Sequence, residues 1–117
     1  MAFYLAKVTR VIDGDTIVAD VKLGFSLWKH DETIRLYGID APELKGESRE
    51  RGKIARDYLK TLILDQEVQL ETFDDKRDRW GRLVAGVFIA DMQSIRIMML
   101  DKGHAIPYIG DIFEGNT

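Results

Sequence analysis

Residues 12–16 read Ile-Asp-Gly-Asp-Thr and separate two stretches that have the composition of β-strands. Residues 3–12 are rich in aromatic and β-branched side chains, and residues 16–23 alternate apolar with polar ones. Asp13-Gly14 is one of the strongest two-residue hairpin signals, because glycine tolerates the positive φ that such a turn needs. The chain is therefore predicted to begin with a β-hairpin in which Asp15 lies beside the turn.

The region that follows the hairpin indicates a loop over residues 24–31 and a third strand over residues 32–39, whose alternation points Arg35 away from the core. Pro42 cannot donate to a strand ladder, so residues 40–43 are predicted to form an ordered loop at the end of that strand. Loops held by a rigid scaffold often carry functional residues.

The second half of the chain alternates between helical and strand patterns. Apolar side chains recur at helical spacing after Ser48, which we expect to be the N-cap, and the last predicted helix ends just before Gly103, a suitable C′ residue. The predicted elements are helices over residues 48–64 and 93–102 and strands over residues 67–73 and 83–90.

The resulting order, β-β-β-α-β-β-α, predicts an α+β fold that is mainly β. Five short, mostly sequential antiparallel strands with a helix after the third match a five-stranded OB-fold β-barrel with two packed helices, which leaves few sheet edges exposed. A chain of 117 residues has room for one core, and no repeat or linker interrupts it. We expect one domain over residues 1–117.

Composition limits the classes of partner and metal. The net charge of −3 argues against indiscriminate binding to polyanions, although residues 43–60 and 76–82 are locally basic. The longest apolar run, residues 83–90, is too short to span a membrane, and the N-terminus has no pattern of a secretory signal. We expect a cytoplasmic monomer without a membrane partner, while a secreted mature form stays open. Without cysteine, any metal must be held mainly by oxygen.

Acidic and basic side chains recur in an order that suits one chemistry. Asp15, Asp40 and Glu43 supply carboxylates, and Arg35 and Arg82 supply guanidinium groups. Hydrolysis of a phosphodiester with a hard cation requires these types of group. An EF-hand is excluded, because no stretch has its acidic loop pattern. Asp13 is interpreted as a turn former and not as a metal ligand.

Three separated motifs carry a resemblance to a known family. They are Ile12-Asp-Gly-Asp-Thr16, Arg35-Leu36 followed by Asp40-x-Pro42-Glu43, and Asp78-Arg-Trp-Gly-Arg82, with Gly52 and Ala55 entering the helix. In this order they resemble the staphylococcal nuclease (thermonuclease) family. The resemblance implies an OB barrel and a calcium-dependent nuclease that hydrolyses DNA, RNA or both and leaves 3′-phosphate ends.

The resemblance also implies roles for residues. Asp15, Asp40 and the backbone carbonyl of Ala41 would bind Ca²⁺, Glu43 would act as general base, and Arg35 and Arg82 would bind the phosphate. Tyr37, Trp80 and Tyr108 are candidates for contact with bases or sugars, and packing is the alternative for the two tyrosines. The chain departs from the family pattern at Ala41, where threonine is usual, and at Trp80, where tyrosine is common.

Two other interpretations stay open at this point. A catalytically silent OB module that binds nucleic acid or protein is the alternative to a nuclease, because the fold alone does not specify hydrolysis. An enzyme that needs a partner or a further C-terminal segment is the other.

Overall fold

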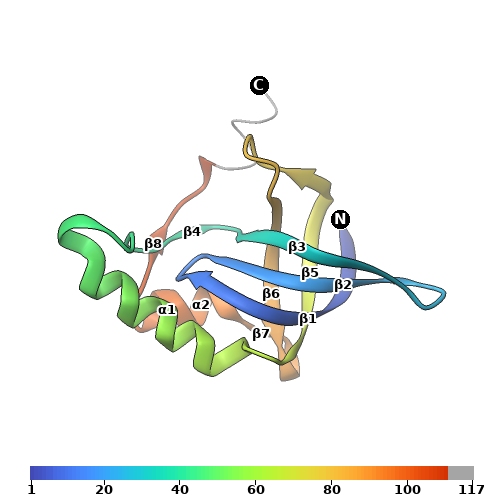
Figure 1. Cartoon of the computed structure of the whole chain (residues 1–117), viewed down its shortest axis with the longest axis horizontal. Helices are drawn as coiled ribbons and strands as arrows, with labels where there is room; N and C mark the ends of the chain where they lie inside the picture. The colour runs from blue at the N-terminus through green and yellow to red at the C-terminus, as the bar shows by residue number, and fades with distance from the viewer. Residues whose placement is uncertain (111–117) are drawn as a thin grey trace.

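The computed structural model describes residues 1–110 as a curved sheet with two helices at its side (Figure 1). No helix in this part of the chain is long and apolar enough to cross a membrane. The strands are β1 (Ala2–Asp13), β2 (Thr16–Gly24), β3 (Leu27–Leu36), β4 (Ile39–Asp40), β5 (Glu67–Arg77), β6 (Leu83–Ile89), β7 (Gln93–Ser94) and β8 (Ile106–Pro107). The helices are α1 (Arg49–Ile63) and α2 (Ile95–Asp101), with short 3₁₀ turns η1 (Gly46–Ser48) and η2 (Ala90–Met92).

The long strands close into a barrel. Their order is β3-β2-β1-β5-β6, and β3 also pairs in parallel with β6 through Ile34 opposite Leu83 and Leu36 opposite Ala85. The other pairings in the barrel are antiparallel. Closure gives each of these strands two neighbours, as in an OB fold. The predicted α+β class and the five-stranded barrel with two helices are confirmed.

One apolar core fills the barrel and continues beneath the helices. The strands alternate because successive side chains of a strand point to opposite faces. Each barrel strand therefore contributes buried residues to the same cluster, and α1 and α2 add one apolar face each. Fully buried members include Val8, Ile17, Ile34, Leu59, Ile63, Leu70, Ile95 and Met99. The domain predicted for residues 1–117 includes 111–117, which lie outside the described residues.

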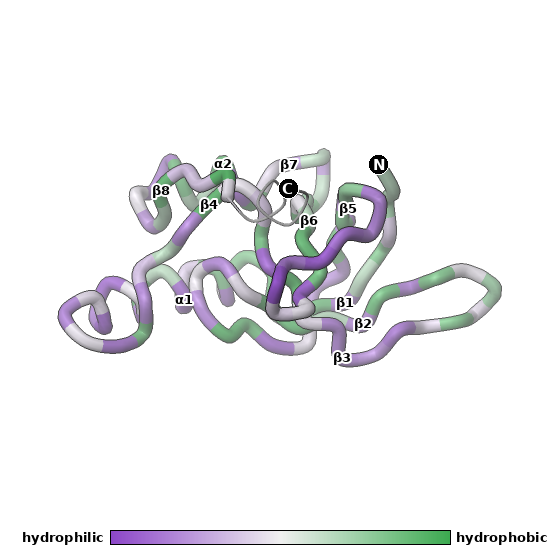
Figure 2. Tube along the Cα trace, turned by 90° about the horizontal axis from the view of Figure 1, so that it is seen from above, coloured by the Kyte–Doolittle hydropathy of each residue, from purple (hydrophilic) through white to green (hydrophobic). Residues whose placement is uncertain are grey.

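The segment predicted as a loop over residues 24–31 is instead the end of a long β2–β3 hairpin, so this prediction was wrong. The hairpin extends away from the rest of the molecule in both views (Figures 1 and 2). Its two-residue turn is Phe25-Ser26, both with positive φ, and Phe25 is fully exposed. Since neither face of this end is buried, its side chains need not alternate, and the strand pattern is absent from the sequence.

Three further expectations need correction at the level of single residues. Ser48 occupies the N-cap position of α1, but its side chain makes no capping bond; its hydroxyl donates to the carbonyl of Glu43 at 2.8 Å. Gly14 is not in the positive-φ region, and a Cβ there would lie 2.6 Å from the Cβ of Ala41. Glycine is therefore needed for close approach and not for turn geometry. Asp40, predicted in a loop, lies in the short strand β4 opposite Ile106 of β8.

Candidate active site

One pocket of about 310 Å³ collects most of the residues that the sequence singled out. It lies where the β1–β2 turn, the end of β3, the segment after β4 and the β5–β6 loop meet. Two residues not predicted for the site, Asp13 and Pro42, also line it. The predicted residues in the lining are Asp15, Arg35, Asp40, Ala41, Glu43, Trp80, Arg82 and Tyr108. Tyr37 is absent from it.

The β1–β2 turn holds Asp15 in a fixed position. Asp13 forms the turn by accepting a hydrogen bond from the backbone N–H of Asp15 at 3.0 Å, as expected of a turn-forming aspartate. The Asp15 carboxylate in turn accepts bonds from the Thr16 hydroxyl at 3.0 Å and from the backbone N–H of Ala41 at 2.8 Å. Asp15 is buried, and the bond from Ala41 joins the β1–β2 turn to the segment after β4.

Arg35 lies between the two predicted ligand carboxylates. Its guanidinium nitrogens are 3.7 Å from Asp15 Oδ2 and 3.7 Å from Asp40 Oδ1, and Nη1 donates to the Leu36 carbonyl at 2.9 Å. Arg35 is only 5% exposed, although strand alternation predicted that it points away from the core. The site itself covers it, with the Tyr108 ring centroid 5.7 Å from Cζ. Arg35 therefore presents a buried, oriented positive charge to this pocket.

The segment after β4 brings the remaining acids to the same opening. Asp40 lies in β4, and β8 aligns this strand through the pairs Ile39 with Pro107 and Asp40 with Ile106. The next hydrogen bond, from the Tyr108 N–H to the Gly38 carbonyl at 2.9 Å, places Tyr108 beside the pocket. Glu43 follows in the loop and is exposed. Sequence reasoning missed β8, because a two-residue strand carries no periodic pattern.

The β5–β6 loop holds Arg82 through a carboxylate for which the sequence predicts no role. Asp78 is buried and accepts hydrogen bonds from the backbone N–H groups of Trp80 at 2.9 Å and Arg82 at 3.0 Å. It also accepts the Nε–H of Arg82 at 2.7 Å. Such charge-assisted bonds are stronger than neutral ones. Asp78 thus fixes both the loop and the direction of the Arg82 side chain.

The three aromatic candidates have different positions. Trp80 is 66% exposed and lies next to Arg79 and Arg82, whose Cζ atoms are 4.4 and 5.2 Å from its ring centroid. Tyr108 is half-buried in the pocket wall. Tyr37 packs on Phe73 with ring centroids 4.6 Å apart and takes no part in the lining. Trp80 and Tyr108 line the pocket, where a ligand can contact them, and Tyr37 packs outside its lining.

Burial, together with repulsion between the acids, raises the pKa values of two carboxyl groups in this pocket. Burial, followed by a hydrogen bond and repulsion from Asp15, raises the pKa of Asp13 to about 6. Burial also raises the pKa of Asp40, with further contributions from Asp15 and Glu43, and Arg35 opposes the shift. Acids crowded in this way favour a proton or a cation nearby, and shifted pKa values are common at functional sites.

The oxygen-only set of donors fits a hard cation. Asp15 and Asp40 face one pocket, and the backbone of Ala41 lies against the Asp15 carboxylate. Within residues 1–110 no group of three or more acidic or histidine side chains forms a complete metal cluster. Two carboxylates, one backbone carbonyl and water would therefore have to supply the ligands, and Ca²⁺ accepts such mixed oxygen sets.

Comparison with known proteins supports the family that the motifs resemble. Residues 33–114 match the family described as Staphylococcal nuclease homologue. A thermonuclease of Staphylococcus intermedius is 40% identical over 91 residues, which are 75% of this chain and 49% of that protein. An uncharacterized endonuclease of Escherichia coli O157:H7 is 35% identical over 103 residues, 87% of this chain and 60% of that protein. Endonuclease YncB of Bacillus subtilis (strain 168) is 36% identical over 120 residues, 97% of this chain and 52% of that protein.

These relatives are longer than the matched region. The chain spans between 49% and 60% of the length of the three proteins named above. The family match, in contrast, covers well over half of the chain and includes the segments that carry Arg35, Glu43 and Arg82. The chain belongs to the staphylococcal nuclease family.

Proposed function

We propose that this protein is a Ca²⁺-dependent nuclease that hydrolyses phosphodiester bonds of DNA, RNA or both. The observation that carries the proposal is the meeting of Asp15, Asp40, Glu43, Arg35 and Arg82 at one pocket of about 310 Å³. These residues come from four separate parts of the sequence, so the fold has to bring them together. The names of the relatives, a thermonuclease and two endonucleases, support the same class of reaction.

The metal would be held by Asp15, Asp40 and the carbonyl of Ala41. Burial, and then repulsion from Asp15, raises the pKa of Asp40, and a bound divalent ion would offset both effects. Bound Ca²⁺ supplies positive charge that offsets the charge developing on the phosphoryl oxygens. The buried Asp15 has the fixed orientation that a ligand requires, because Thr16 and the Ala41 N–H already bond to its carboxylate.

The protein side chains would perform the other steps. Arg35 and Arg82 are held by Asp15, Asp40 and Asp78, so their planar donors are oriented before substrate arrives. They would bind the scissile phosphate. Glu43 would accept a proton from the attacking water, whose oxygen bonds to phosphorus as the bond to the 5′ oxygen breaks and the leaving 5′ oxygen takes a proton from solvent. This polarity leaves the 3′-phosphate end that the family resemblance implies.

Parallel digestion of labelled DNA and RNA with Ca²⁺, with Mg²⁺ and with chelator tests the proposal. Cleavage should require Ca²⁺, and Glu43→Gln should slow it by about 100-fold or more, because the general base is lost. Glu47→Gln is the matched control, since Glu47 is an exposed acid four residues further on that does not line the pocket. Full cleavage in chelator, or a Glu43→Gln variant as active as the control, would contradict the mechanism.

The same samples distinguish a nuclease from a catalytically silent module that only binds. It would shift oligonucleotides in a gel and leave them uncut when Ca²⁺ is present. Because the relatives are longer, cleavage that appears only when the full reading frame is expressed would indicate that a further segment or partner completes the enzyme.

A further inference from the structure

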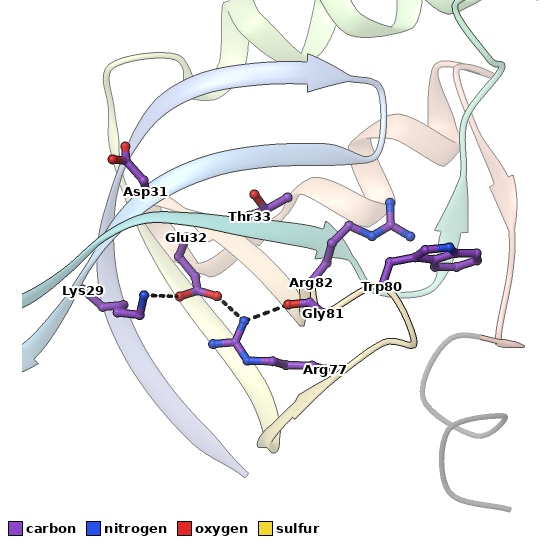
Figure 3. Close-up of a pocket in the computed structure, with 8 residues that line it drawn as sticks. All are labelled: Lys29, Asp31, Glu32, Thr33, Arg77, Trp80, Gly81 and Arg82. Atoms are coloured by element: carbon purple, nitrogen blue, oxygen red, sulfur yellow. Dashed lines mark hydrogen bonds and ion pairs between the residues drawn. The ribbon is translucent and has the colours of Figure 1, made fainter.

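A second, larger pocket adjoins the candidate active site (Figure 3). Its volume is about 750 Å³, within the range of about 300–1,000 Å³ that is common for ligand sites. Lys29, Glu32 and Thr33 of β3 form one wall, and Arg77 of β5 forms another. Trp80 and Arg82 line both pockets. These two residues therefore lie at the boundary between the pockets.

In the second pocket two exposed basic side chains pair with one buried acid. Glu32 is only 6% exposed, and its carboxylate bonds to Arg77 and lies 3.7 Å from Lys29 Nζ. One negative charge is thus shared by two cations, whose side chains are 45% and 61% exposed. Asp31 also lines the pocket, and Figure 3 shows its carboxylate turned away from this cluster. The cluster leaves excess positive charge to attract an anion.

A hydrogen bond connects this cluster to the active-site loop. Nη1 of Arg77, which bonds to Glu32, also donates to the Gly81 carbonyl at 2.9 Å. Gly81 lies between Trp80 and Arg82, the two residues shared by the pockets. Residues 74–82 carry four basic side chains against three acids, so this segment keeps a net positive charge that favours an anion. The second pocket is thus structurally continuous with the first.

We propose that the second pocket binds the nucleotides adjacent to the scissile phosphate of a single-stranded nucleic acid. Lys29 and Arg77 contact a backbone phosphate there, and the exposed Trp80 ring stacks on a base at the boundary between the pockets. A basic groove combined with an aromatic platform is the usual arrangement for binding single strands. The inference rests on the proposed function, because the active-site pocket defines which phosphate is cleaved. It names the substrate as a strand longer than a dinucleotide.

Binding measurements test the second pocket independently of cleavage. Fluorescence anisotropy with Ca²⁺ on the Glu43→Gln background compares a labelled ten-nucleotide strand with a labelled dinucleotide, in DNA and RNA arms. Lys29→Gln should weaken binding of the long strand by about three- to tenfold and reduce its salt slope by about 0.7, the value for one phosphate contact. The dinucleotide should lose much less. Lys60→Gln, an exposed lysine of α1 outside both pockets, is the matched control and should change neither.

The outcomes separate this inference from the proposed function. Lys29→Gln and Lys60→Gln could have equal effects, or long and short strands could bind with equal affinity. Either result would contradict a role of the second pocket in binding, even if the unaltered chain cleaves DNA and RNA. Long-strand binding that depends on Lys29 without any cleavage would overturn the hydrolysis and support the second pocket. Absence of binding to every strand would overturn both. Recovery of long-strand affinity in Lys29→Arg would support a charge contact.

Discussion

Asp78 shows how one buried carboxylate can prepare a site that it does not line. Its side chain is 2% exposed and accepts from two backbone N–H groups and from the Nε of Arg82. Asp78 lies in a loop, where no periodic pattern marks buried residues, and the sequence alone therefore predicts no role for it. The signal that could have revealed it is its spacing, because an Asp two residues before a potential donor commonly closes a local turn.

Replacing Asp78 with alanine should therefore reduce both activity and stability. Removal of the acceptor leaves loop N–H groups and the Arg82 guanidinium without their partner, at a cost of about 2–3 kcal/mol in the free energy of unfolding. Cleavage should fall further than unfolding alone explains, since Arg82 loses its orientation. Chemical denaturation and steady-state kinetics measure the two effects. Asp57→Ala, which removes an exposed acid paired with Arg56, should change neither; equal behaviour of both variants would contradict this role.

Asp75 is a single residue that should make the stability of the protein depend on pH. Its carboxylate accepts from the Thr72 hydroxyl at 2.7 Å and the Tyr4 hydroxyl at 2.8 Å, and these bonds lower the pKa of Asp75. A folded-state pKa below the unfolded value, about 3.9, means that the charged form is favoured by folding. The stability that the Asp75 carboxylate contributes is fully present above the pKa of the unfolded state. It is lost as pH falls through the pKa of the folded state.

Asp75→Asn should consequently remove part of the acid sensitivity of the protein. The unaltered chain should lose more stability than the variant when urea unfolding is followed from pH 6 downward past about pH 3.9. Asp74→Asn is the control, because both positions have positive φ, which asparagine tolerates, while Asp74 is bonded to the N-terminal amine. Identical pH profiles for the Asp75 and Asp74 variants would show that the two hydroxyl contacts do not influence acid unfolding.

At the scale of elements, α1 supports the loop that carries the proposed base. Gly52 lies in the first turn of α1 against the backbone of that loop, and a Cβ there would come 2.5 Å from the Glu43 carbonyl oxygen and 2.9 Å from that of Pro42. Ser48, just before α1, donates to the same Glu43 carbonyl. Helix and loop are thus joined by close packing and by a hydrogen bond. Glycine in this helix serves close approach and not flexibility.

Gly52→Ala should displace Glu43 although alanine is the better helix former. The clash with backbone atoms costs about 1–3 kcal/mol, which offsets the gain of about 1 kcal/mol from helix propensity. A shift of the loop by even about 1 Å can reduce turnover by about 100-fold. Kinetics and thermal unfolding should show lower kcat without added stability. Lys60→Ala, on the exposed face of α1, should leave turnover unchanged; a more stable and fully active Gly52→Ala would refute the packing argument.

The elements also show which parts of the fold a sequence can predict. Strands β1, β2, β5 and β6 each have one buried face or a continuous apolar run, and their periodicity placed them correctly. The outer half of the β2–β3 hairpin has no buried face, so Trp28 and its neighbours carried no pattern and suggested a loop. Strands β4 and β8 are two residues each, and only their pairing across the fold defines them.

At the scale of the whole molecule, the barrel brings motifs that are far apart in the sequence to one site. Asp15, Arg35, Glu43 and Arg82 were selected from motif order, and the structure places all four at the same pocket. Two features could not be predicted, because they depend on long-range contacts. One is the alignment of Asp40 by the C-terminal β8, and the other is the neighbouring pocket formed by Glu32 and Arg77, which are 45 residues apart. Neither has a local signature.

Binding of Ca²⁺ should stabilise the entire fold, because the proposed ligands come from the β1–β2 turn and from β4. At a free concentration 100 times its Kd, a ligand of the folded state alone adds about 2.7 kcal/mol to the free energy of unfolding. Thermal unfolding should therefore shift upward with Ca²⁺ relative to chelator. The raised pKa of Asp40 means that its charge opposes folding above that pKa when no cation is present.

Asp40→Asn should have opposite effects in the two conditions. In chelator the variant should be at least as stable as the unaltered chain, since an amide avoids the cost of burying a charge and the repulsion from Asp15 and Glu43. With Ca²⁺ its upward shift should be much smaller, since one proposed ligand loses its charge. Asp57→Asn, an exposed acid on α1, should keep the full shift. A Ca²⁺ shift that is absent from the unaltered chain, or equal in both variants, would remove Asp40 from the metal site whatever the cleavage assays show.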